Sequence, residues 1–249
     1  MRIALIIFSF LLVPVAGANP PLASDSSSRD RIRVQLGAAQ EASLASQMEG
    51  RIVALPKKLG DTFRKGDLLV AFACDHHKAA LAAAAAQVVR AEKSLQSRES
   101  LLQLQAVSEL DVELAKAESA QAAAELSRQQ AIVSDCRVLA PFPGKVVRVM
   151  VNQWETVSRG TVLVHIVNPQ TLEIEAVVPS LWLRWLKVGT RFAVAVDELG
   201  RDVEAEVVAI GGRIDPVSQS VPVKARITSA TDGLLPGMSG YARFEPSDG

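Results

Sequence analysis

The sequence predicts an elongated, multi-domain protein of mixed α and β class. In the predicted architecture, a β-sandwich is split by a long antiparallel α-helical hairpin and is followed by a small β-barrel. Three observations support this prediction: an alanine-rich stretch without helix breakers, a sequence repeat that flanks it, and a C-terminal third rich in β-branched residues.

The alanine-rich stretch, residues 75–136, is expected to form the hairpin. There is no Gly or Pro between Asp67 and Ala140, and 16 of the 62 residues in the stretch are Ala, which favours helix. A seven-residue apolar series covers its first half, namely Leu81, Val88, Leu95 and Leu102. A second series, with Leu114 on the same face, covers the other half: Leu110, Ala117, Ala124 and Ala131. Two helices of about 45 Å each, joined near residues 105–108, would explain both series. A compact helical domain is the alternative, but it would need wider apolar faces and some aromatic residues.

The repeat consists of residues 50–70 and 144–164, which align without a gap at an offset of 94. Gly50 matches Gly144, Lys65-Gly66 matches Arg159-Gly160, and Leu69-Val70 matches Leu163-Val164. Each copy has the pattern of strand, turn and strand, with Gly where the chain reverses. A repeated unit interrupted by a helical insertion predicts one sandwich, assigned to residues 48–74 and 137–167.

The barrel is assigned to residues 31–47 and 168–249. Short β-branched segments separated by Gly turns predict its strands, at residues 32–36, 172–178, 191–196, 203–210 and 221–227. Residues 181–186 are expected to form a short helix whose Trp182 and Trp185 close one end of the barrel.

The N-terminus has the pattern of a secretory signal peptide. Arg2 precedes an apolar run from residue 3 to 13, and Ala16-Gly-Ala18 has small residues at the positions a signal peptidase requires. We therefore expect residues 1–18 to be a signal peptide and residues 19–30 a flexible leader of the exported protein. A retained membrane anchor is the alternative, although the run is shorter than the roughly 20 residues that span a bilayer.

Taken together, these motifs resemble the periplasmic adaptors, or membrane fusion proteins, of the HlyD/RND efflux type. In that family, a hairpin separates two halves of a biotinyl/lipoyl-like sandwich. The segment Arg137-Val-Leu-Ala-Pro-Phe-Pro-Gly144 resembles the family's entry into the second half, and Leu235-Pro-Gly-Met238 with Tyr241-Ala-Arg-Phe244 resembles its barrel ending. The resemblance covers about residues 30–245.

The resemblance implies a non-enzymatic periplasmic protein that bridges an inner-membrane transporter, of RND or ABC type, to a TolC-like outer-membrane channel. It also implies a homo-oligomeric ring in the assembled complex. Family hairpin tips carry an Arg, a Leu and a Ser in fixed order, and the corresponding residues are Arg98, Leu101 and Ser108. Leu101 and Ser108 have the family spacing, whereas Arg98 lies one residue closer to them.

Other functions lack their sequence signals. The formal net charge is zero, and no basic run is interleaved with aromatic residues, so nucleic acid is not an expected partner. No HExxH, phosphate-binding glycine loop or GxSxG motif is present, and neither an enzyme nor a cofactor is expected. The sequence ends with the expected barrel, so no membrane-proximal domain is expected, and the transporter class stays open.

The two cysteines, Cys74 and Cys136, are expected to form a disulfide across the hairpin base. Facing residues of an antiparallel pair have numbers that add to a near constant, about 211 for a turn at residues 105–106, and these two add to 210. An oxidising compartment favours the bond. Two alternatives remain: reduced, buried cysteines, or a zinc or copper site made by Cys74, His76, His77 and Cys136. The metal site would suit a periplasmic metal-binding or chaperone protein on the same fold.

Overall fold

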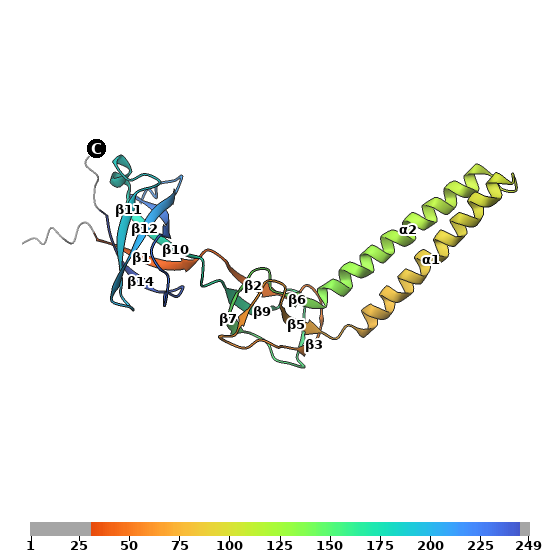
Figure 1. The fold of residues 1–249 in the computed structure, drawn as a ribbon, viewed down its shortest axis with the longest axis horizontal. Coiled ribbons are helices and arrows are strands. Elements are labelled where there is room, and N and C mark those ends of the chain that lie inside the picture. Colours follow the sequence, from red (N-terminus) through yellow and green to blue (C-terminus); the bar gives the residue numbers. More distant parts are fainter. Residues whose placement is uncertain (1–30, 245–249) are drawn as a thin grey trace, which may run out of the picture.

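The computed structural model describes residues 31–244. Figure 1 shows three parts in a row: a β-barrel at one end, a sandwich of two sheets in the middle and a pair of helices at the other end. The predicted signal peptide and leader, residues 1–30, lie outside the described residues, as do the last five residues of the predicted barrel domain.

The barrel is closed and has six antiparallel strands in the order β1-β10-β13-β12-β11-β14. The strands are β1 (Arg31–Ala38), β10 (Leu172–Pro179), β11 (Arg191–Val196), β12 (Arg201–Ile210), β13 (Ser220–Ile227) and β14 (Ser239–Arg243). Alternate residues of β10 are buried, beginning with Leu172 and Ile174, as the pleat of a half-buried strand requires. The predicted barrel is therefore confirmed, and all five predicted segments are strands in it.

One end of the barrel is closed by aromatic side chains. The short 3-10 helix η2 (Ser180–Arg184) follows β10 and supplies Trp182. The ring centroids of Trp182 and Trp185 lie 5.3 and 6.3 Å from that of Phe244, which stacks on Phe192 at 4.2 Å. These edge-to-face and stacked contacts leave both indoles only partly exposed.

The sandwich consists of two four-stranded sheets, ordered β2-β9-β7-β4 and β6-β5-β3-β8. Its strands are β2 (Glu41–Ala45), β3 (Gly50–Ala54), β4 (Thr62–Phe63), β5 (Leu68–Phe72), β6 (Arg137–Leu139), β7 (Gly144–Val149), β8 (Thr156–Val157) and β9 (Val162–Val167). The offset of the repeat relates β3, β4 and β5 to β7, β8 and β9. Strand β4 pairs with β7 and β8 pairs with β3, so each sheet takes its short strand from the other copy. Neither half can complete a sheet alone.

The assignment of residues 31–47 to the barrel is wrong for their second part. Only β1 lies in the barrel, whereas β2 pairs with β9 at the edge of a sandwich sheet. Strand β2 has the same place beside β9 that β6 has beside β5. Its five residues, Glu-Ala-Ser-Leu-Ala, have little β-branched or alternating character, so the sequence did not distinguish it from a continuation of the preceding strand.

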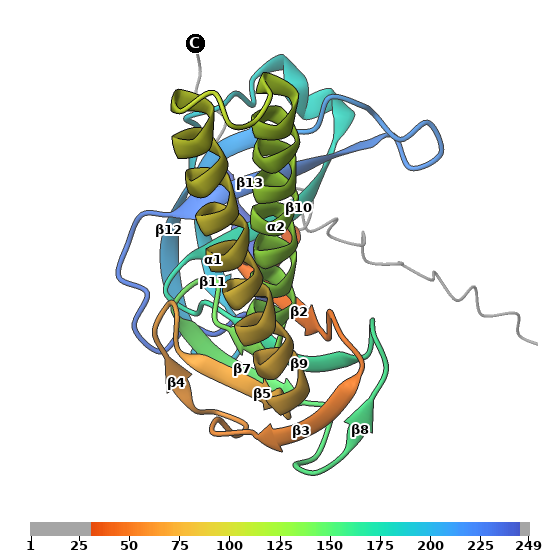
Figure 2. The same ribbon diagram turned by 90° about the vertical axis from the view of Figure 1, so that its right-hand side faces the viewer.

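The two helices are α1 (Asp75–Gln103), with 29 residues, and α2 (Glu109–Asp135), with 27. At 1.5 Å per residue, each is about 40 Å long. They lie side by side along their length and project away from the sheets (Figures 1 and 2). Within residues 31–244, no helix is long and apolar enough to cross a membrane.

The contact between the helices is built from small residues. The buried positions are Ala84 and Ala91 on α1 and Val112, Ala115 and Ala122 on α2. The first predicted series is half-buried along this contact, but the second is wrong, because all of its members are exposed: Leu110, Leu114, Ala117, Ala124 and Ala131. The alanines of α2 occupy four of the seven heptad positions, so several faces looked equally suitable. The most buried positions of the seam are small side chains that let the backbones approach closely, and the half-buried leucines of α1 add to the contact.

Candidate functional site

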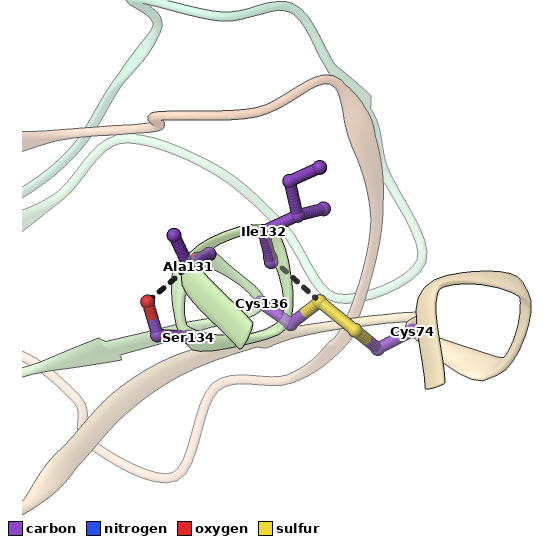
Figure 3. The surroundings of a disulfide bond; sticks show 5 residues. All are labelled: Cys74, Ala131, Ile132, Ser134 and Cys136. Atoms are coloured by element: carbon purple, nitrogen blue, oxygen red, sulfur yellow. Dashed lines mark hydrogen bonds between the residues drawn. A yellow bond between two sulfur atoms is a disulfide. The ribbon is translucent and has the colours of Figure 1, made fainter. Parts of the chain in front are cut away.

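The base of the hairpin is where the two helices leave the sandwich. Cys74 directly precedes α1 and Cys136 directly follows α2, and their Cα atoms are 6.0 Å apart. In the structure, the two sulfur atoms are joined in a disulfide, and both residues are buried (Figure 3). The neighbouring strands β5 and β6 pair with each other, so the sheet and the disulfide both hold the bases of α1 and α2 together.

The alternative metal site is not assembled here. Both sulfurs belong to the disulfide and cannot act as thiolate ligands. His76 is exposed and His77 half-buried on the first turn of α1. Across residues 31–244, no group of three or more His, Cys, Asp or Glu side chains is placed to hold a metal ion.

At the other end, α1 finishes in a Schellman-type turn. The backbone N–H of Gln105 donates to the carbonyl of Leu102 at 2.8 Å, and that of Ala106 donates to the carbonyl of Leu101 at 2.9 Å. Gln105 has a φ of 56°, in the left-handed region that helix ends usually fill with Gly. The tip therefore carries backbone strain at a residue that the sequence did not single out.

Replacing Gln105 with Gly is expected to stabilise the hairpin by about 0.5–1 kcal/mol, because Gly removes the Cβ clash of the left-handed conformation at some cost in unfolded-state entropy. Thermal unfolding followed by helical circular dichroism measures the change. The matched control is Gln121→Gly at an exposed position within α2, which should destabilise by about 1 kcal/mol. A lower melting temperature for Gln105→Gly would contradict the assigned turn.

Ser108 caps the start of α2. Its hydroxyl oxygen accepts from the backbone N–H of Asp111 at 3.2 Å, and the Asp111 carboxylate accepts from the Ser108 N–H at 2.9 Å and from its hydroxyl at 2.7 Å. This is a capping box, with an Asp in the place of the usual Glu. The Ser108 hydroxyl, followed by its backbone N–H, lowers the pKa of Asp111. Ser108 thus has a structural role in addition to any contact with a partner.

Asp111 also faces the first helix. A guanidinium nitrogen of Arg98 lies 3.8 Å from its carboxylate, which joins the last turns of α1 to the first turn of α2. Both side chains are well exposed, so the pair contributes little to stability, but it biases the direction of the Arg98 side chain. Sequence reasoning missed Asp111, although Ser108-Glu-Leu-Asp111 has the spacing of a capping box.

Exposed leucines surround these polar groups. Leu101 is 38% exposed, Leu104 76% and Leu110 67%. Exposed apolar side chains gathered at the end of a projecting element are typical of a protein contact surface. We call Arg98, Leu101, Leu104, Ser108 and Leu110 the hairpin tip. Of the three tip residues predicted from sequence, Leu101 is the exposed apolar one, while Arg98 and Ser108 both contact Asp111.

No protein-family model matches the chain. Among curated proteins, it is 30% identical over 237 residues to nodulation protein NolF of Rhizobium meliloti, covering 89% of this chain and 64% of that protein. It is 28% identical to an uncharacterised protein of Haemophilus influenzae, covering 82% of this chain and 54% of that protein. The chain thus spans less than two thirds of either relative.

Solved structures share the whole arrangement. A candidate efflux transporter of Bacteroides eggerthii matches with a TM-score of 0.70 and 25% identity, over 85% of this chain and 67% of that chain. The membrane fusion protein Spr0693 of Streptococcus pneumoniae matches with a TM-score of 0.72 and 21% identity. The match covers 86% of this chain and 98% of that chain. A MacA–MexA chimera with the hairpin domain of Pseudomonas aeruginosa MexA matches with a TM-score of 0.75 and 17% identity. The match covers 87% of this chain and 80% of that chain.

The six-stranded barrel, the paired sheets and the projecting helices together form one elongated fold. The chain has the fold of the membrane fusion proteins, or periplasmic adaptors, to which it is structurally similar. The family resemblance expected from the sequence is confirmed.

Proposed function

We propose that this protein is the periplasmic adaptor subunit of a tripartite efflux or secretion system and has no enzymatic activity. It would bridge an inner-membrane transporter, of RND or ABC type, to a TolC-like outer-membrane channel. The observation that carries the proposal is the hairpin: two packed helices about 40 Å long whose free end exposes leucines. The structural likeness to membrane fusion proteins supports the same role.

The shape suits this task because a bridge needs reach and stiffness together. Two helices packed along their length resist bending more than one exposed helix does. At the base, strands β5 and β6 and the disulfide fix the direction in which the hairpin leaves the sandwich. Movement of the sandwich would thus be carried to the tip. Several copies in a homo-oligomeric ring would be needed to enclose a sealed path.

The sandwich in this proposal is the biotinyl/lipoyl-like domain of the family. Its two pseudo-equivalent halves exchange their short strands, and the hairpin occupies the position between them. The periplasm is the proposed location, after export by the N-terminal signal peptide. A disulfide between the two cysteines of the chain is consistent with that oxidising compartment.

The proposal is tested by crosslinking in living cells. A photo-crosslinking amino acid at Leu104, the most exposed leucine of the hairpin tip, should capture an outer-membrane channel protein. The same amino acid at Val89, which is exposed halfway along α1, is the matched control and should capture much less of it. Equal yields of the channel at both positions, or none at Leu104, would remove the tip from the mechanism.

Substitutions at the hairpin tip should separate docking from folding. Leu101→Asp is expected to reduce recovery of the channel with the adaptor by about tenfold or more, because it places a charge in an apolar contact. Val89→Asp is the control and should leave recovery unchanged. Ser108→Asn keeps a capping residue, so it should retain helicity and lower recovery only if the hydroxyl contacts the channel. Full recovery with Leu101→Asp would contradict the proposed contact.

A further inference from the structure

The closed end of the barrel carries a second exposed surface, formed by residues 180–190 and 208–219. We call this surface the barrel cap. The backbone N–H of Ser180 donates to the carbonyl of Gln219 at 2.8 Å, and that of Gly189 donates to the carbonyl of Val207 at 2.8 Å. These bonds hold η2 and the following turn against the β12–β13 connection. In Figure 2, that connection extends beyond the rest of the barrel.

Apolar side chains of the barrel cap point into solvent. Leu181 is 67% exposed, Val188 64% and Val217 93%, and the exposed set also includes Leu183, Val208 and Ile214. Trp182 and Trp185 of the same segment pack on Phe244, and these aromatic contacts fix the backbone that carries the exposed leucines. Burial of these groups is not needed to close the barrel, whose own core is complete without them.

The charges of the barrel cap are mainly positive. Arg184, Lys187 and Arg213 are exposed, and within the described part of the chain none of the three forms an ion pair. The one acidic residue, Asp215, accepts hydrogen bonds from the backbone N–H groups of Val217 and Ser218 and from the Ser218 hydroxyl. Its charge is therefore partly neutralised by local donors.

The barrel cap lies at the end of the barrel at which β10 finishes, away from the connection to the sandwich. Strand β1 begins at this same end, because it runs antiparallel to β10 and its last residues pair with the first residues of β10. In Figure 1, the hairpin projects from the opposite end of the molecule. The barrel cap therefore lies on the barrel, and the hairpin tip lies at the other end of the elongated molecule.

We propose that the barrel cap binds the anionic surface of a lipid bilayer. Leucine and valine side chains would enter the headgroup region, the tryptophans would lie at its edge, and the arginines and lysine would contact lipid phosphates. Short apolar groups beside basic ones, with indoles at the boundary, are the composition of interfacial membrane contacts. Each cation near an anionic surface adds attraction that salt screens. The inference does not rest on the adaptor role.

The test is sedimentation of the purified exported protein with vesicles. Binding is expected to vesicles of phosphatidylethanolamine with phosphatidylglycerol, and not to vesicles of phosphatidylcholine. The double variant Arg184→Gln/Lys187→Gln should weaken binding to the anionic vesicles about tenfold or more. Leu181→Ser/Val217→Ser should weaken it by a similar factor, since it removes two exposed apolar side chains.

All variants are purified in the same exported form, so that their N-termini are identical. Arg90→Gln/Lys93→Gln removes the same charge from the exposed face of α1 and should bind as the original protein does. Brominated lipids provide a second readout, since they should quench the tryptophan emission of the bound protein and not that of the Arg184/Lys187 variant. Equal binding of both barrel-cap variants and the original protein, or no binding to anionic vesicles, would overturn the proposal.

Discussion

Replacing Gly144 with Ala is expected to destabilise the protein by about 3 kcal/mol or more. Gly144 opens β7, where a Cβ would run into the backbone carbonyl oxygen of Val167 in the neighbouring strand β9 and lie 3.1 Å from the ring of Phe63. The carbonyl belongs to the sheet and cannot turn aside as a flexible side chain would. The strands must separate, and the sandwich core that they cover would be opened.

The repeat provides a matched control for this substitution. Gly50 has the equivalent place in the first copy, but its Cβ would meet only side-chain atoms, of Phe72 at 3.4 Å and Met48 at 3.5 Å. Gly50→Ala should therefore change the free energy of unfolding by no more than about 1 kcal/mol. Urea unfolding of the two variants gives the comparison. Equal effects at both glycines would contradict the tight contact at β9.

The repeat also shows how far sequence reasoning reached in the sandwich. Two of its matched glycines, Gly66 and Gly160, have φ values of 87° and 88°, so they do reverse the chain in a conformation that favours Gly. Gly50 and Gly144 do not have positive φ and start strands instead. Of these two, Gly144 requires the absence of a side chain, because the backbone of the neighbouring strand packs closely against it. A pattern of matched glycines cannot distinguish these two reasons.

One pair of the repeat departs from the expected residue type. Gly60, with φ of 84°, corresponds to Trp154, with φ of 73°, and both donate a backbone N–H to matching strand residues. A bulky residue in the left-handed region is a clear exception among proteins. The two copies have the same backbone shape at this turn although the second has Trp in place of Gly.

The helices were predictable in extent but not in orientation. Their ends follow from the absence of Gly and Pro and from the break before Ser108, so the turn lies where it was expected. The face of α2 was not predictable, because a helix rich in Ala has no strong apolar stripe to fix its rotation. The same ambiguity affected the hairpin tip. Leu110 was assigned to the seam between the helices, but it is an exposed residue of the hairpin tip.

Loss of the Cys74–Cys136 disulfide is expected to lower stability by roughly 4 kcal/mol, from the chain-entropy cost of closing a loop with a sequence separation of 62. The reason lies in the unfolded chain, where the bond would hold together two residues that otherwise separate widely. The paired strands β5 and β6 make the same connection in the folded protein only. The double variant Cys74→Ser/Cys136→Ser should therefore keep its fold and unfold at lower urea concentration.

Thiol titration of the unreduced, denatured protein from the periplasm comes first and should find no free thiol. Unfolding of the double variant is then compared with that of the original protein with and without reductant. Reductant should lower the midpoint of the original protein toward that of the variant and leave the variant unchanged, which separates the bond from the cost of two polar serines at buried positions. Two free thiols per chain would contradict the disulfide. An unfolding midpoint of the original protein that does not change when the disulfide is reduced would show that the sheet alone holds the hairpin base.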